Sequence, residues 1–289
     1  MNHPHVREKI REYPNRFFDS SVWNDLALRE GDIVIASYAK AGTTWLQQIV
    51  AQLIFRGEAE IDVSAISPWV DGVYPDKATK LALLDAQSHR RLMKTHLPAD
   101  ALVTSALVKY LYIGRDGRDI ALSLYDHQCA LRQDAQIGMD AGTAEPGKLR
   151  VLPPPRLTRD AYVAQWLEQE GAPFWPLWEG VRSWWERRAD ANVLQLHYND
   201  LLDDLPGQIR RIAAFLDIPI PPANGTRSWR TAASTTCDSM QRATCRRGPD
   251  YGAKAAKHSS TRAAVAADAL PCRMHSIMHM CNAHMRNLA

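Results

Sequence analysis

The feature that most constrains the fold is an apolar, β-branched run, GDIVIASY at residues 31–38, followed at once by AKAGTTWLQQIVAQLIFRG. A run of this kind is typical of a buried strand. The segment after it has apolar residues at helical spacing, and these are Trp45, Ile49, Val50, Leu53 and Ile54. The sequence therefore predicts a strand, a tight turn and a helix that Gly57 ends.

The same alternation continues along the chain. Further strands are expected at RRLMKTHLP (90–98), KYLYIG (109–114) and NVLQLHYNDLL (192–202), and a short polar turn at 21–25. Helices are expected over 100–109, from 115 onwards, and over 162–170, 176–188 and 206–218. Strands that alternate with helices predict an α/β protein with a central, mainly parallel sheet flanked by helices.

The segment 134–158 is rich in Gly and Pro and has no sustained period, so we expect a long surface loop of the kind that often forms a lid. Aromatic residues crowd the chain after it, namely Trp166, Phe174, Trp175, Trp178, Trp184 and Trp185. Most of them should pack between helices. A minority, with the Pro-rich stretch 151–156, is expected to line an apolar ligand pocket.

Composition excludes several classes of protein. The chain is 46% hydrophobic and 23% charged, with no run near the ~18 apolar residues of a membrane span. Its N-terminus is polar where a signal peptide needs an apolar stretch, which predicts a cytoplasmic location and no membrane partner. The net charge of +3 argues against a general nucleic-acid binder.

The chain changes character near Pro222. Residues 1–222 carry 25 Lys and Arg against 29 Asp and Glu, whereas residues 223–289 carry 10 against 3. Leu, Ile, Val and Phe number only four in that tail, far fewer than a packed core needs. We therefore expect an α/β domain over 1–222 and a basic, poorly ordered tail over 223–289.

The tail also holds four of the five cysteines, but none of them forms a Cys-x₂₋₄-Cys pair, so no metal site is expected. A shift to Ala, Arg, Thr, Cys, His and Met is what a G+C-rich gene gives when it is read out of frame. The alternative is a divergent tail that orders on binding a partner or a metal.

The strongest chemical signal is Tyr38-Ala39-Lys40-Ala41-Gly42-Thr43-Thr44-Trp45, at the turn from strand to helix. Amides at a helix start lack partners, glycine lets an anion approach them, and a lysine adds charge, which together predict a P-loop-like phosphate cradle. The spacing is not the Walker pattern. An ordinary capped helix beside a chance lysine explains the segment about equally well when it is taken alone.

Two more polar segments follow strands. Lys94-Thr95-His96-Leu97-Pro98 ends one strand, and Arg115-Asp116-Gly117-Arg118-Asp119 follows another, with Ser123 further along its helix. The carboxyl ends of parallel strands face one crevice, so His96 should lie near the Lys40 turn and be able to accept a proton. The plainer interpretations are a structural histidine and an ion pair between Arg115 and Asp119.

Together these segments resemble the cytosolic-type sulfotransferase family, which uses 3′-phosphoadenosine 5′-phosphosulfate as sulfuryl donor. The resemblance covers about residues 15–222: YAKAGTTW, KTHLP, YIGRDGRDIALSLY and LQLHYNDLLDDLPGQIRRIAAFL occur in the family's order. It implies that His96 is the base, with Lys40 and Lys94 acting on the transferring group. The other donor-binding residues that it implies are Gly42, Thr43, Thr44, Trp45, Arg115, Ser123 and Tyr198.

The resemblance implies a small acceptor with a hydroxyl or amine, apolar or aromatic in character, and no metal. Two departures stand against it. Ala41 occupies a position where the family usually has Ser, and the tail lacks the segment with which the family closes over the donor. A P-loop nucleotide kinase or NTPase, or a nucleotide-binding remnant without turnover, are the alternatives. The sequence leaves the oligomeric state open.

Overall fold

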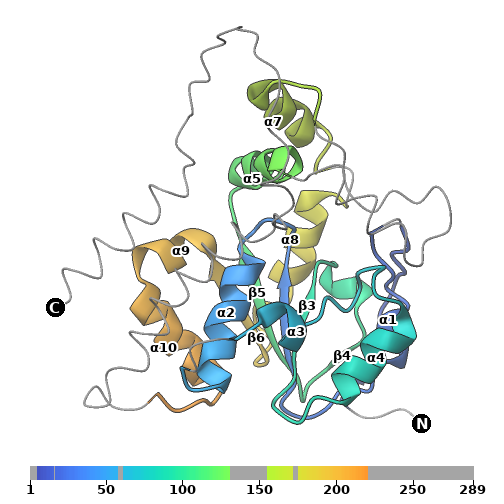
Figure 1. Cartoon of the computed structure of the whole chain (residues 1–289), viewed down its shortest axis with the longest axis vertical. Coiled ribbons are helices and arrows are strands. Elements are labelled where there is room, and N and C mark those ends of the chain that lie inside the picture. The colour runs from blue at the N-terminus through green and yellow to red at the C-terminus, as the bar shows by residue number, and fades with distance from the viewer. Residues whose placement is uncertain (1–4, 16, 58–60, 131–154, 172–174, 221–289) are drawn as a thin grey trace, which may run out of the picture.

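The structure is a computed structural model that describes residues 5–15, 17–57, 61–130, 155–171 and 175–220. Figure 1 shows a central sheet with helices packed around it. The expected tail 223–289, most of the predicted loop 134–158 and Phe174 lie outside the described residues, so the expected boundary at 222 stays a prediction.

The strands are short and the helices vary in length. The strands are β1 (Val6–Arg7), β2 (Ile33–Ser37), β3 (Leu92–Thr95), β4 (Thr104–Ser105), β5 (Lys109–Gly114) and β6 (Val193–His197). The helices are α1 (Val22–Asp25), α2 (Thr43–Ile54), α3 (Val63–Ile66), α4 (Lys77–Asp85), the 3₁₀ turn η1 (Ala99–Ala101), α5 (Gly117–Ala130), α7 (Arg159–Glu168), α8 (Leu177–Trp185), α9 (Tyr198–Asp203) and α10 (Leu205–Phe215).

The central sheet has the order β3-β2-β5-β6, and every neighbouring pair in it is parallel. Strands β1 and β4 form a separate antiparallel pair. The predicted α/β class with a mainly parallel sheet is therefore confirmed. Because crossover connections bring all four strands to the same direction, their carboxyl ends meet at one edge of the sheet.

Both faces of the sheet are covered, which explains why strand β2 is buried throughout and apolar from Ile33 to Ala36. Ile33 and Ile35 point into a core formed with α2, α9 and α10. Val34 and Ala36 point into a second core on the other face, which includes residues of α1, α5, α7 and α8. In Figure 1 helices α5 and α7 lie side by side beyond the carboxyl ends of the strands.

Three local predictions were wrong. The expected helix over 100–109 is the turn η1 followed by β4, because Ser105 pairs with Val6 and its amide donates to the Tyr110 hydroxyl at 2.9 Å. The strand expected over 192–202 ends at His197, whose Nδ1 accepts from the Asn199 amide and caps α9. The turn expected at 21–25 contains the short helix α1.

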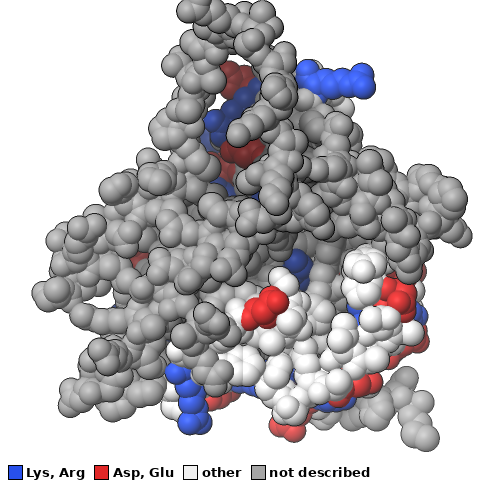
Figure 2. Space-filling model, in the orientation of Figure 1, with Lys and Arg blue, Asp and Glu red and all other residues white. Residues whose placement is uncertain are grey.

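Charges of both signs are mixed on the described surface over α1 and α4, as the lower right of Figure 2 shows. Ion pairs join these helices and their surroundings, Lys77 with Asp25 and Arg29 with Asp85. Within the described ranges, no helix combines the length and apolar character needed to cross a membrane.

Candidate active site

The turn between β2 and α2 has the geometry of an anion cradle. Lys40 and Gly42 both have positive φ, 67° and 107°, and the Ala41 amide donates to the Tyr38 carbonyl at 3.2 Å. Gly42 is the N-cap of α2 and offers no side chain to the helix amides. The first-turn amides therefore face outwards, where an anion is stabilised by them and by the helix dipole.

Glycine is required at this turn for a second reason. A Cβ at Gly42 would lie 2.7 Å from Cδ2 of Tyr198, closer than side-chain carbons pack. Tyr198 starts α9 at the end of β6, so the cradle is shaped by a residue far away in sequence. Thr43 is buried and Thr44 is exposed at the helix start.

The carboxyl edge of the sheet brings predicted residues from three strands together. Arg115, just after β5, donates from Nη1 to the Lys40 carbonyl at 3.1 Å, and its guanidinium lies 4.2 Å from the centre of the Tyr198 ring. The Tyr198 ring in turn packs edge-on against Trp45, 5.4 Å between ring centres. Trp45 and Tyr198 are both almost fully buried.

Arg115 also carries a polar group that suits a ligand. Its Nε is buried and makes no hydrogen bond within the described part of the chain. The Asp119 carboxylate lies 3.7 Å away, so the ion pair that the plainer interpretation expects is present but long. Ser123 is half-buried further along the same helix, α5.

His96 lies just after β3 and is held by the end of β2. Its Nδ1 is 2.9 Å from the Ser37 carbonyl. A carbonyl only accepts, so Nδ1 carries the proton and Nε2 has the lone pair. Burial, and then the charge of Lys94 and that of Lys40, lower the pKa of His96 to about 3, against the hydrogen bond to Ser37, which raises it. The ring is therefore neutral at physiological pH.

Ser37 is a site residue that the sequence analysis missed. Its hydroxyl lies 2.5 Å from Oγ1 of Thr43 and 3.4 Å from Nδ1 of His96, so it joins the cradle to the histidine. It is the last residue of the apolar strand β2, and a hydroxyl that directly precedes Tyr38-Ala39-Lys40 was the only signal that could have found it.

Lys94 and His96 both contact the ring of Trp69. Its ammonium is 5.4 Å from the centre of the Trp69 ring, and the same ring packs edge-on against His96, 5.2 Å between centres. Such a contact holds a lysine without neutralising it.

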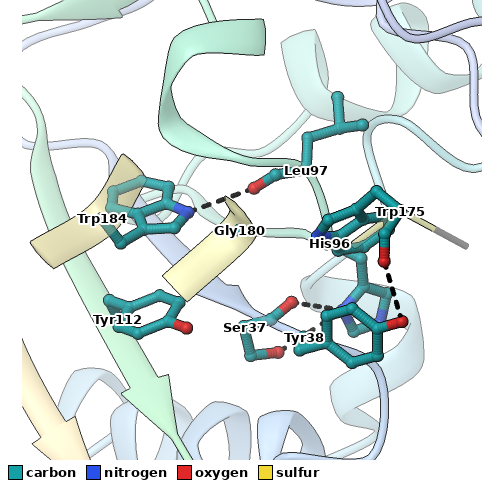
Figure 3. Close-up of a pocket in the computed structure, with 8 residues that line it drawn as sticks. All are labelled: Ser37, Tyr38, His96, Leu97, Tyr112, Trp175, Gly180 and Trp184. Atoms are coloured by element: carbon teal, nitrogen blue, oxygen red, sulfur yellow. Dashed lines mark hydrogen bonds between the residues drawn. The ribbon is translucent and has the colours of Figure 1, made fainter. Parts of the chain in front are cut away.

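A narrow cavity opens beside His96 (Figure 3). It is too narrow to hold a water molecule, and its lining is mostly aromatic: Ser37, Tyr38, His96, Leu97, Tyr112, Trp175, Gly180 and Trp184. The Trp184 ring stacks on Tyr112, and its Nε1 donates to the Leu97 carbonyl at 3.1 Å. Two members of the predicted aromatic cluster, Trp175 and Trp184, thus line a cavity at the histidine.

In the ranges that the structure describes, no three His, Cys, Asp or Glu side chains gather into a group that could hold a metal ion. The four C-terminal cysteines lie outside those ranges.

Comparison with known proteins gives one consistent result. The model of the sulfotransferase domain family matches residues 30–265. The glycolipid sulfotransferase of Mycobacterium bovis is 32% identical over 264 residues, which cover 83% of this chain and 79% of that protein. Rat sulfotransferase 1 family member D1 is 29% identical over 201 residues, 67% of this chain and 61% of its own.

Solved structures agree on the fold. Mouse sulfotransferase SULT7A1, complexed with PAP, superposes with a TM-score of 0.57 at 21% identity, over 82% of this chain and 76% of its own. Retinol dehydratase in complex with androsterone and PAP gives a TM-score of 0.58 at 24% identity, over 76% of this chain and 68% of its own. These findings do not favour a nucleotide kinase or NTPase. The cradle, the histidine beside it and the match over most of the chain lead to one conclusion: this protein is an enzyme of the sulfotransferase domain family.

Proposed function

We propose that the chain transfers a sulfuryl group from 3′-phosphoadenosine 5′-phosphosulfate to a hydroxyl or amine of a small apolar or aromatic acceptor, with His96 as the base. The observation that carries this proposal is the placement of Ser37. One residue holds the histidine through its carbonyl and contacts the cradle residue Thr43 through its hydroxyl. Ser37 therefore links the proposed proton acceptor, His96, directly to the anion site at Thr43.

The donor's charged groups suit the residues at the sheet edge. In this P-loop-like turn, the first-turn amides of α2 would hold the 5′-phosphosulfate of the donor, together with Gly42, Thr43, Thr44 and Lys40. Arg115, whose Nε has no hydrogen-bond partner among the described residues, would hold the 3′-phosphate with Ser123. Trp45 and Tyr198 would contact the adenine.

The reaction then needs one base and several fixed positive charges. The acceptor oxygen or nitrogen attacks sulfur, its proton passes to Nε2 of His96, and the bond between sulfur and the bridging oxygen breaks with its electrons going to the phosphate. Lys40 and the α2 amides neutralise the charge that develops there. Lys94 orients the transferring group. As in phosphoryl transfer, positioning and electrostatics carry the catalysis.

The cavity beside His96 supports an aromatic or apolar acceptor. Its walls are the rings of Tyr38, Tyr112, Trp175 and Trp184, which offer flat apolar surface. The cavity is too narrow for a ligand group as these rings stand, so an acceptor that reaches His96 here would have to move them apart. The mycobacterial relative is named for glycolipids, so hydroxyl-bearing lipids belong in the acceptor screen beside phenols, alcohols and amines. The cytoplasmic location stays a prediction, which fractionation of the source cells checks.

Titration calorimetry tests the donor. We expect 3′,5′-bisphosphoadenosine to bind and ATP with Mg²⁺ to bind much more weakly. Tight binding of ATP alone would overturn the proposal. A screen of acceptors with labelled donor then identifies the second substrate.

Arg115 offers a sharper test because Arg118 is a matched control. Arg118 follows it by three residues, is paired with Asp116, and has a side chain 74% exposed. We expect Arg115→Ala to weaken bisphosphate binding by about 1.5 to 3 kcal/mol, the usual value of a hydrogen bond to a charged group. Arg118→Ala should change it little. Adenosine 5′-phosphosulfate, which lacks the 3′-phosphate, should bind both variants alike. If Arg115→Ala weakens the binding of this ligand as much as that of the bisphosphate, Arg115 does not bind the 3′-phosphate.

A further inference from the structure

A buried carboxylate, Asp71, lies behind the two residues that the proposed function places at the reacting group. The Asp71 side chain is fully buried. It follows Trp69 in a segment that extends the sheet beyond β3, since Trp69 bridges Lys94 in parallel and the Val70 amide donates to the Lys94 carbonyl at 3.0 Å. This carboxylate plays no part in the chemistry described so far.

The groups around Asp71 are donors. The Trp69 indole donates to Oδ2 at 2.8 Å, the His96 amide to the same oxygen at 3.2 Å, and the Trp23 indole to Oδ1 at 3.4 Å. The Thr95 hydroxyl also donates to it. Burial outweighs these donors and raises the pKa of Asp71 above its usual value, whereas each of the four hydrogen bonds favours the ionised carboxylate.

A positive charge near Asp71 offsets part of the cost of burying it. The Lys80 side chain is 1% exposed and donates to the Gly72 carbonyl. Its charge interacts favourably with Asp71, and also with Asp19 and Asp76. Such an arrangement is costly to assemble and is sensitive to the loss of one member.

Three of the donors reach the proposed catalytic residues. The His96 amide belongs to the base itself. The Thr95 hydroxyl accepts from the Leu97 amide at 3.1 Å, so Asp71 secures the backbone on both sides of His96. The indole of Trp69 is held so that its ring lies against both His96 and the ammonium of Lys94.

We propose that Asp71 is a positioning residue for sulfuryl transfer: by accepting from Trp69, Thr95 and the His96 amide, it sets the placement of His96 and Lys94 relative to the cradle. The inference rests on the proposed function. Asp71 does not touch the reacting atoms, and its role is to keep the base and the lysine in a productive geometry, where an error of about 1 Å can cost about 100-fold in rate.

The chain contains a matched control, Asp32. Its side chain is 3% exposed and binds Arg91 at 2.8 Å, so its removal also leaves a buried donor without an acceptor. Asp32 precedes β2, at the amino end of the sheet, away from the candidate site. A variant there reports the general effect of losing a buried carboxylate.

The experiment compares Asp71→Ala with Asp32→Ala in the full chain, at a temperature at which circular dichroism shows both to be folded. We expect kcat of Asp71→Ala to fall about 10- to 100-fold, with bisphosphate Kd and acceptor KM within about 2-fold of the unmodified chain. The kcat of Asp32→Ala should stay within about 2-fold. If Asp71→Ala does not fold, Asp71→Asn takes its place, with Asp32→Asn as its control. A kcat that falls no further than in the control overturns the proposal.

A second measurement does not need turnover. In a chain labelled with ¹⁵N-histidine, the Nδ1 proton that His96 donates to Ser37 should give a slowly exchanging signal, which His96→Gln assigns by its loss. We expect this signal to disappear or exchange fast in Asp71→Ala and to persist in Asp32→Ala; an unchanged signal in both overturns the proposal. Failure of the proposed function looks different: the unmodified chain then binds no bisphosphate and sulfates no acceptor, while the proton signal still reports what Asp71 does.

Discussion

The proposed function makes His96 the proton acceptor, and burial lowers the pKa of this histidine to about 3. If it is the base, His96→Ala should lower kcat by about 10² to 10⁴ and leave bisphosphate affinity nearly unchanged. Because the ring stays neutral well below its ordinary pKa, kcat/KM should show no acid limb near pH 6.5. Rate profiles between pH 5 and 8 check this, and a limb at pH 6.5 that His96→Ala abolishes would contradict it.

The same residue predicts how stability depends on pH. The folded pKa lies below the unfolded value of about 6.5, so the unfolded chain binds an additional proton as the pH falls from 6.5 towards 3. Acidification therefore weakens the folded state through His96. Thermal unfolding at pH 7 and pH 5 should show a larger loss for the unmodified chain than for His96→Gln. Equal losses would mean that His96 titrates normally.

At the scale of elements, helix α8 joins the core to the candidate site through one of two adjacent tryptophans. Trp184 is 1% exposed, stacks on Tyr112 and donates to the Leu97 carbonyl next to His96, whereas Trp185 is 56% exposed. Trp184→Ala should destabilise the fold by about 3 to 5 kcal/mol. Trp185→Ala should change the free energy of unfolding by no more than about 0.5 kcal/mol. Urea unfolding measures both free energies. Similar losses in the two variants would contradict the assignment of Trp184 to the buried face of α8 and of Trp185 to the exposed face.

At the scale of the whole molecule, the open matter is what residues 223–289 contribute. We propose that they are not a native sulfotransferase C-terminus, because of their charge, their scarcity of core-forming residues and the missing donor-closing segment. Donor affinity should suffer first, which would leave the chain weakly active or inactive. A chain shortened to residues 1–222 should then bind bisphosphate within about 2-fold of the full chain, because a tail that makes no contact with the donor contributes nothing to its affinity. The family match extends to residue 265, so a 10-fold loss on shortening would show that this segment binds the donor.

The gene tests the same proposal directly. Translating its other two frames beyond codon 222 should reveal a Phe-bearing helix, an Arg/Lys-Lys-Gly stretch and a Gly-x-Trp segment. If neither frame contains them, the idea of a frameshift is wrong and the tail must be explained as it stands.

The sequence by itself determined the parallel α/β class, the β2–turn–α2 unit and the identity of Lys40, His96 and Arg115 as site candidates. These follow from local rules: periodicity sets the elements, and parallel strands send their carboxyl ends to one edge. The tertiary structure decided the rest. Residues 104–105 are a strand only because β1 lies beside them, and the low pKa of His96 arises from burial that no local pattern encodes. Asp71 reaches the candidate site across 25 residues of chain, because hydrogen bonds of a buried carboxylate depend on which segments the packed core brings together.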